Sequence, residues 1–487
     1  MKNVPQEKSF KQPKIFYYST IMVLGERIGS TILIFLLTLF LKNYYHFSDT
    51  SAFAIFAIFS ALSCITPVIG GYLADNYLGI KRCMGLGLFF ELSGYIILSL
   101  PLNSMLVLNL ALSLILTGIG LFKTGPTNLM GRSYSENDCR IDSGFTLYYM
   151  GINIGGFIAS ICSGVYKIGG WNAPFMLSSV GILFAIIWFF CFRRDARECD
   201  VKIALRPIPI KKWLFTSLGV LIFVLASMYL FRNGNIAKSC FYVSIMCLMI
   251  FFMYQIIISP RKEKLAIVTT IILMFMAMFF FLLYFQIFTS VTLYIDRCVD
   301  RKFFSFTIPT VFLLGLNPIF IFIFSPFLAL LYKALAKRNN DLLITIKLPL
   351  GLLLTGFSFL LLYISTFVIT SNGKTSLFWI IFTFSLFAAG ELLTSALGVA
   401  MITQIAPKRL YGVMMGGWFL IGLALAADLA GSLASLTSIP THLLSNELAM
   451  SHIYGLGFLK MSSIAIIIAI IGFILSPWLQ RMINAKS

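Results

Sequence analysis

The stretch Val23-Leu24-Gly25-Glu26-Arg27 places a carboxylate and a guanidinium inside an apolar run that extends from Ile15 to Leu41. About 20 apolar residues are enough for a helix to cross a bilayer. An ionised side chain near the middle of such a span costs ~2.5–3.5 kcal/mol on insertion scales. We therefore expect Glu26 and Arg27 to face a protein interior or a water-filled cavity, with partners there. A purely structural pair that locks two helices together is the alternative.

The whole chain has the composition of a polytopic membrane protein. It contains 487 residues, of which 59% are hydrophobic and 11% are charged. Apolar runs of spanning length repeat along it, which predicts an all-α protein with about fourteen transmembrane helices. The formal net charge of +19 comes from basic residues in short loops between spans, where the positive-inside rule places them. We therefore exclude nucleic acid as a partner and expect a lipid bilayer around the protein.

The apolar runs form a group of six, a group of two and a second group of six. The first six lie at about 15–41, 51–74, 83–101, 104–130, 143–166 and 173–192. The next two lie at about 213–231 and 239–259. The last six lie at about 266–295, 303–332, 343–370, 376–405, 410–437 and 452–480. This order predicts an N-terminal bundle over 1–192, a basic linker with an extra hairpin over 193–264, and a C-terminal bundle over 265–487.

Lysine and arginine alternate between rich and poor loops. The rich set includes Lys81-Arg82 and the segment 193–212, whereas Lys42 and Lys167 belong to the poor set. The positive-inside rule then places both termini in the cytoplasm. One loop on the opposite side departs from the rule, and it contains Arg297, Arg301 and Lys302 beside two aspartates.

The loop after the second span reads Gly70-Gly71-Tyr72-Leu73-Ala74-Asp75-Asn76-Tyr77-Leu78-Gly79-Ile80-Lys81-Arg82. Gly71 allows close helix contact, and Asp75 can accept hydrogen bonds from the N-terminus of a neighbouring helix. Lys81 and Arg82 hold the loop on the cytoplasmic side. The spacing resembles the cytoplasmic loop signature of the major facilitator superfamily, where its role is conformational.

Further polar residues lie inside the spans. Lys123 lies in the fourth run, and Pro126 breaks the helix just beyond it. A lysine at this depth needs a carboxylate or a substrate anion, unless its stem reaches the cytoplasmic surface. Additional polar positions are Asn153 in the fifth run and Gln286, Asn317, Glu391, Ser395 and Trp418 in the second half. Glu91 and Asp428 are two more intramembrane acids.

These motifs together resemble the proton-dependent oligopeptide transporter family, the peptide branch of the major facilitator superfamily. The segments that carry the resemblance are Gly70 to Arg82, Phe145 to Gly156, Asn317-Pro318, Gly390 to Gly398 and Met414 to Leu420. The resemblance implies two six-helix bundles, the extra hairpin of bacterial members, and a bacterial inner membrane. It also implies alternating access around a midplane site between the bundles.

The resemblance also implies roles for matching residues. Glu26 and Arg27 match the last two positions of the first-helix Glu-x-x-Glu-Arg motif, and with Lys123 and Glu391 they are expected to couple protons. Arg27 and Lys123 are expected to be buried cations that hold the substrate carboxylate, and Glu391 is expected to hold the amino group. The full set expected to bind substrate is Arg27, Lys123, Asn153, Gln286, Asn317, Glu391, Ser395 and Trp418.

Three positions depart from the family pattern. Val23 replaces the first glutamate of the motif, Ile34 replaces an arginine, and Phe285 replaces an acid. The loss of charge at Ile34 and Phe285 together is self-consistent, because losing one partner alone would strand a buried ion. Val23 has no such compensation, so its half of the site carries excess positive charge unless Glu91 reaches it.

We expect a secondary active transporter that imports di- or tripeptides with protons. The alternative is a related carrier for single amino acids or another small anion, with altered or absent proton coupling. A membrane-embedded enzyme is less favoured because the sequence shows no His or Cys metal spacing inside the spans. A channel is less favoured because paired acids and bases in both halves suit a gated site. We expect no metal, no cofactor and function as a monomer.

Overall fold

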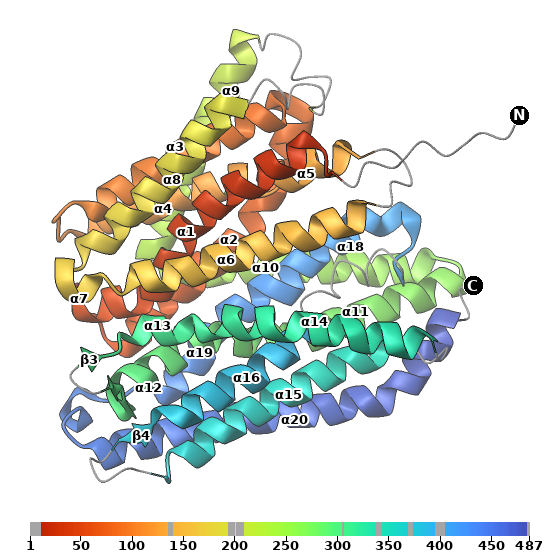
Figure 1. The fold of residues 1–487 in the computed structure, drawn as a ribbon. Helices are drawn as coiled ribbons and strands as arrows, with labels where there is room; N and C mark the ends of the chain where they lie inside the picture. The colour runs from red at the N-terminus through yellow and green to blue at the C-terminus, as the bar shows by residue number, and fades with distance from the viewer. Residues whose placement is uncertain are drawn as a thin grey trace, which may run out of the picture. The chain divides into compact units, whose positions relative to one another are not determined.

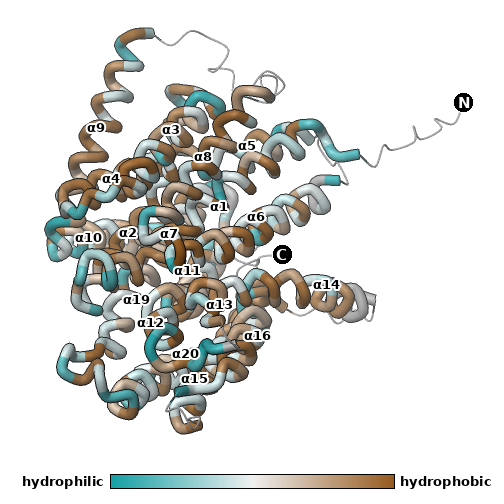
Figure 2. Tube along the Cα trace, turned by 60° about the vertical axis from the view of Figure 1, so that its left-hand side comes forward, coloured by the Kyte–Doolittle hydropathy of each residue, from teal (hydrophilic) through white to brown (hydrophobic). Residues whose placement is uncertain are grey.

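The computed structural model describes residues 11–134, 140–192, 200, 209–303, 306–337, 343–368, 374–394 and 405–484. Within these ranges 14 helices are long and apolar enough to cross a membrane. Apolar residues cover most of each helix in Figure 2, and polar residues gather toward helix ends. These features confirm the predicted all-α polytopic class.

The elements of the first half are mainly long helices (Figure 1). They are α1 (Lys14–Asn43), α2 (Asp49–Leu73), the π-helical η1 (Ala74–Leu78), α3 (Ile80–Ser99), α4 (Met105–Phe122), α5 (Gly125–Arg132), α6 (Ile141–Ser163), α7 (Tyr166–Gly169), α8 (Asn172–Phe192), α9 (Ile210–Arg232) and α10 (Gly234–Ile258).

Several spans of the second half are interrupted. Its helices are α11 (Arg261–Tyr284), the 3₁₀ segment η4 (Phe285–Phe288), α12 (Ser290–Cys298), α13 (Thr310–Leu314), α14 (Leu316–Lys337), α15 (Ile344–Ser365), α16 (Leu377–Thr394), the 3₁₀ segment η5 (Lys408–Leu410), α18 (Tyr411–Gly417), the π-helical η6 (Trp418–Leu425), α19 (Ala426–Ala434), two short 3₁₀ turns (Ser435–Thr437 and Thr441–Leu443) and α20 (Glu447–Asn484). Its strands are β1 (Val299–Asp300), β2 (Lys302–Phe303), β3 (Phe306–Thr307) and β4 (Thr375–Ser376).

The short strands correct one predicted boundary. The tenth run was expected to begin near residue 303, but its helix begins at Thr310. Before that helix, β2 pairs with β3 in an antiparallel arrangement. The preceding strand β1 pairs with β4 in parallel. Pro309 then precedes the helix in an extended conformation, as residues before a helix commonly do.

The chain divides into two compact units. Unit 1 comprises Met1–Thr31, Thr66–Ala159 and Phe175–Ala226, and unit 2 comprises Ile32–Ile65, Ser160–Pro174 and Ser227–Ser487. Unit 2 therefore includes the second part of α1 and most of α2. The predicted division into 1–192, 193–264 and 265–487 follows the order of the spans along the chain. The two units are defined by contacts instead, so they do not test that division, which stays a prediction.

Unit 1 is held together by close helix contacts at glycine. In the packing of α3 on α4, a Cβ at Gly118 would lie 2.6 Å from the carbonyl oxygen of Gly87. In the packing of α2 on α4, a Cβ at Gly70 would overlap the carbonyl oxygen of Gly120. Lipid supplies no hydrophobic drive between helices, so such backbone approach is a main source of attraction.

In unit 2, α15 packs against both α16 and α20, and Figure 1 shows α15 between them. The hairpin helix α10 joins this unit through polar bonds at two depths. Tyr242 donates a hydrogen bond of 3.0 Å to Asp428 of α19. Near the other end of α10, Arg409 donates to Gln255 at 2.9 Å and to Ser259 at 2.5 Å. The intramembrane acid Asp428 thus has its partner on the extra hairpin.

The contact at Gly70 can be tested by adding one methyl group. Gly70→Ala is expected to lower the free energy of unfolding by about 1–3 kcal/mol, the usual effect of overpacking. Gly219→Ala is the matched control, because a Cβ at Gly219 meets no atom within 4 Å. The measurement is the thermal unfolding midpoint of the purified protein in detergent, and equal midpoints for the two variants would contradict the packing described.

Candidate functional site

The acid and base of the opening stretch lie together in unit 1. On α1, the Arg27 Nε lies 3.7 Å from a carboxylate oxygen of Glu26. The Glu26 side chain is buried, whereas 28% of the Arg27 side chain is exposed. A Cβ at Gly155 would lie 2.9 Å from the Cβ of Arg27, so a glycine lets α6 approach α1 here. The guanidinium therefore keeps partial access while its carboxylate neighbour does not.

Lys123 corrects an expectation, because its side chain is exposed rather than buried. The helix break comes earlier than predicted: α4 ends at Phe122, and Lys123 precedes the start of α5 at Gly125. Pro126 lies in the first turn of α5, where its missing N–H is tolerated. Lys123 still interacts electrostatically with Glu91, so it belongs to the same charged group in unit 1.

Asn153 lies on α6, half-buried. Its side-chain amide donates to the carbonyl oxygen of Tyr149, one turn earlier, at 3.0 Å. This bond fixes the orientation of the amide group on the helix. Its predicted contact with a peptide backbone stays a prediction.

Asn317 and Glu391 lie together in unit 2. The Asn317 side-chain amide donates a 2.8 Å hydrogen bond to a Glu391 carboxylate oxygen. The bond links α14 to α16, and both residues are buried. The Asn317 Oδ1 is a buried acceptor without a hydrogen-bond partner among the described residues. The pair can therefore accept hydrogen bonds from a cationic or amide group.

Gln286 has its hydrogen bonds taken up within unit 2. Its amide nitrogen donates to the carbonyl oxygen of Ala430 at 3.0 Å, and its oxygen accepts from Ser290 at 2.5 Å. The side chain is fully buried and ties η4 to α19. In this conformation Gln286 holds helices together, and its role toward a substrate stays a prediction.

Trp418 is buried at the start of the π-helical η6. Its ring meets Phe281 edge-on, with centroids 6.0 Å apart. Ser395, the other residue predicted to line a pocket, lies outside the described residues.

The predicted conformational loop surrounds η1 in unit 1. Asp75 lies 3.7 Å from Arg132, so it pairs with a base rather than with a helix N-terminus. Asp200 instead accepts from the backbone amides of Ile80 and Lys81, at 2.9 and 3.2 Å, and so caps α3. Sequence reasoning missed this cap because Asp200 lies about 120 residues away along the chain.

The other predicted loop residues are Arg82 and Gly71, and their contacts differ in kind. Arg82 donates to the carbonyl oxygen of Leu78 at 3.2 Å. A Cβ at Gly71 would lie 3.5 Å from the Thr124 hydroxyl, which is ordinary packing distance. Gly71 is therefore less crowded than its neighbour Gly70.

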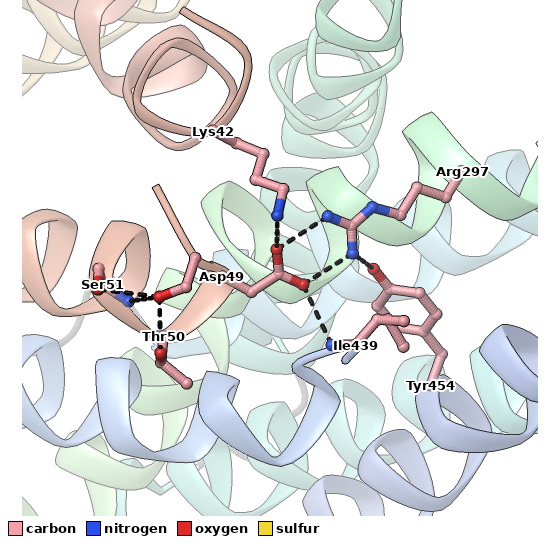
Figure 3. Close-up of polar contacts among 8 residues, drawn as sticks. Lys42, Asp49, Thr50, Ser51, Arg297, Ile439 and Tyr454 are labelled. Atoms are coloured by element: carbon pink, nitrogen blue, oxygen red, sulfur yellow. Dashed lines mark hydrogen bonds and ion pairs between the residues drawn. The ribbon is translucent and has the colours of Figure 1, made fainter. Parts of the chain in front are cut away.

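A buried ionic cluster in unit 2 was not predicted (Figure 3). Asp49, in the first turn of α2, accepts two hydrogen bonds from Arg297 of α12, at 2.8 and 2.9 Å. Lys42 at the end of α1 lies 2.8 Å away, and the backbone amide of Ile439 donates at 3.2 Å. Arg297 also donates to the Tyr454 hydroxyl of α20 at 2.9 Å. The Asp49 carboxylate therefore joins α2 to α1 and α12, and Arg297 extends the cluster to α20.

The cluster explains the loop that departs from the positive-inside rule. Arg297 is neutralised by Asp49, and Arg301 lies 3.1 Å from Asp296. Arg297 and Arg301 are thus held in ion pairs instead of being available to anionic lipid. The position of Arg297 in a loop where basic residues are rare was the one sign of this cluster in the sequence. Residue spacing does not identify the partner of Arg297.

Comparisons with known proteins agree with this architecture. A protein-family model described as the POT family matches residues 82–450. The dipeptide and tripeptide permease A of Erwinia pyrifoliae is 32% identical over 475 residues, which cover 97% of this chain and 96% of that permease. The permease of the same name from Escherichia coli (strain K12) is 31% identical over 475 residues, covering 97% and 94%.

The solved structures agree as well. The structure of a bacterial homologue of the human drug peptide transporters PepT1 and PepT2 matches with a TM-score of 0.85 at 28% identity. The match covers 96% of this chain and 99% of that one, which confirms the predicted major facilitator fold. With a family model that matches most of its length, this chain belongs to the POT family.

Proposed function

We propose that this protein is a secondary active transporter that imports di- and tripeptides together with protons by alternating access. Its membership of the POT family carries this proposal. Relatives named as permeases for dipeptides and tripeptides favour peptides over the single amino acids or other small anions that the sequence left open. The protein is an integral membrane transporter and not an enzyme.

The carboxylate end of a peptide is assigned to the bases of unit 1. Arg27 keeps partial access beside the buried Glu26, and the Lys123 side chain is exposed. A charge-assisted hydrogen bond contributes more than a neutral one, and a guanidinium can bind a carboxylate with two parallel bonds. These properties suit Arg27 and Lys123 to an anionic group.

The amino end is assigned to the pair in unit 2. An ionised carboxylate has about four acceptor positions, and Asn317 occupies one on Glu391. The remaining capacity suits an ammonium group, whose three N–H bonds need acceptors. The unpartnered Oδ1 of Asn317 adds an acceptor for a peptide N–H.

We propose that the Asp49 cluster keeps the outer side of the transporter closed, and we call this cluster the latch. With both termini in the cytoplasm, as basic loops favour, the end of α1 and the start of α2 face outward. The cluster holds these two ends against α12 and α20 in unit 2. Outward opening then requires the bidentate pair to separate. We further propose that the protein lies in the inner membrane of a bacterium and functions as a monomer.

Removing either base should abolish saturable uptake of a labelled dipeptide into liposomes. Arg27→Ala and Lys123→Ala each delete a charged hydrogen-bond donor, which contributes about 1.5–3 kcal/mol and so about 10- to 150-fold in affinity. Lys167→Ala is the control, because the Lys167 ammonium lies 5.1 Å from the Tyr166 ring in α7, a helix that contains none of the assigned residues. Normal uptake by either test variant would remove that residue from the site.

Blocking the peptide amino group tests Glu391. Acetylated dipeptide should compete with labelled dipeptide at least tenfold less well than the free form, since it lacks the ammonium. Glu391→Gln should weaken the free peptide to a similar extent, and acetylation should then add little, as expected for two changes to one contact. Equal competition by acetylated and free peptide in the wild type would exclude the anchor role.

Neutralising Asp49 tests the latch. Asp49→Asn leaves Arg297 and Lys42 without their carboxylate, and removal of one partner of a buried pair costs about 3–5 kcal/mol. The buried Cys298, adjacent to Arg297, should then react with a membrane-impermeant maleimide at least tenfold faster, as located by mass spectrometry. Lys42→Ala keeps the bidentate pair and should change the rate much less. Equal rates for Asp49→Asn and wild type would exclude the latch.

A further inference from the structure

Glu91 of α3 is a completely buried carboxyl group in unit 1. Neither of its carboxylate oxygens has a hydrogen-bond partner among the described residues. A Cβ at Gly118 would overlap the Glu91 Cγ, so the absence of a side chain on α4 creates the space that Glu91 fills. The carboxyl is therefore fixed in place by packing and not by hydrogen bonds.

The charged groups around Glu91 come from two other segments of unit 1. Glu91 interacts electrostatically with Glu26 and Arg27 of α1, and with Lys123 after α4. Tyr95, one turn further along α3, is the other titratable neighbour, and it is also completely buried. Glu91 is thus the acid that reaches the charged group where Val23 supplies none.

The surroundings of Glu91 act in opposite directions: burial and the Glu26 carboxylate disfavour its ionised form, whereas Arg27 and Lys123 favour it. An ionised carboxylate without hydrogen bonds carries a desolvation cost of several kcal/mol. The nearby bases Arg27 and Lys123 offset part of that cost, because opposite charges within a few ångströms stabilise the charged form. A carboxyl group on which burial and nearby charges act in opposite directions can gain and lose a proton within one transport cycle.

The protonation of Glu91 changes the charge that a substrate meets. The charged groups that act on Glu91 are Glu26, Arg27 and Lys123. By formal charge, two bases and one acid leave one positive charge over when Glu91 is neutral, and none when Glu91 is ionised. A carboxylate is attracted to the first state more than to the second. By thermodynamic reciprocity, a bound carboxylate must then favour a proton on Glu91 to the same extent.

We propose that Glu91 is the proton carrier of this transporter, in place of the acid that Val23 lacks. A proton from the outer solution forms an O–H bond on the Glu91 carboxylate, and the peptide carboxylate binds Arg27 and Lys123. After the transition, the peptide leaves and the O–H bond breaks to return the proton to cytoplasmic water. This inference rests on the proposed import of peptides with protons.

The test compares two modes of transport in liposomes that contain the full-length protein. Counterflow of labelled against unlabelled dipeptide needs no net proton movement, whereas accumulation against a concentration gradient does. An inward gradient of one pH unit can drive about tenfold accumulation of a peptide carried with one proton. Glu91→Gln, which mimics the neutral acid, should keep counterflow and lose this accumulation. Val23→Glu combined with Glu91→Gln should restore it, because residue 23 is one helical turn from Glu26.

The control is Asp428→Asn, which neutralises a buried intramembrane acid in unit 2 and should keep both modes. Accumulation that survives in Glu91→Gln, or that is equally lost in Asp428→Asn, overturns the role of Glu91. Absence of wild-type counterflow with any dipeptide would instead refute the proposed function. If Glu91→Gln does not fold, Glu91→Met replaces it, and failure of both shows that the carboxyl serves the fold and the proposal is wrong.

Discussion

The cost of removing an ionised side chain from water governs where the acids and bases of this protein lie. Asp49 is fully buried, and it is surrounded by two basic side chains and a backbone amide. Glu391 and Asp428 each accept a hydrogen bond from a neutral side chain. Each of the three acids is thus stabilised by different partners, and each side-chain partner lies on a helix other than that of the acid. The charges therefore contribute to how helices are held as well as to what they bind.

The acids differ in how completely their partners satisfy them, and this difference separates structural from functional groups. The carboxylate of Asp49 is met by donors on both oxygens, which stabilise its ionised form. Glu391 has one donor from Asn317 and retains capacity for another. Glu91 has no hydrogen-bond donor among the described residues, and the charges that act on it belong to Glu26, Arg27 and Lys123. A carboxylate with fewer hydrogen-bond donors is thus freer to bind a new partner or a proton.

Sequence reasoning predicted the features that depend on local pattern. Span length and spacing predicted most helices to within a few residues, although the helix of the tenth span begins at Thr310 instead of near 303. The contact of Glu26 with Arg27 follows from their adjacency. The exposure of Lys123 was not predicted, because the position of a helix break near a proline depends on which turn tolerates it. The partners of Asp49 were missed because Arg297 lies 248 residues away. No periodicity within one helix encodes such a contact, which arises only when spans assemble.

The bond from Tyr242 to Asp428 makes α10 and α19 dependent on each other. If α10 were deleted, Asp428 would lose the hydroxyl donor that Tyr242 supplies. A buried carboxylate that loses its donor carries the full cost of its removal from water. A shortened protein without α10 is therefore expected to need a neutral residue in place of this aspartate.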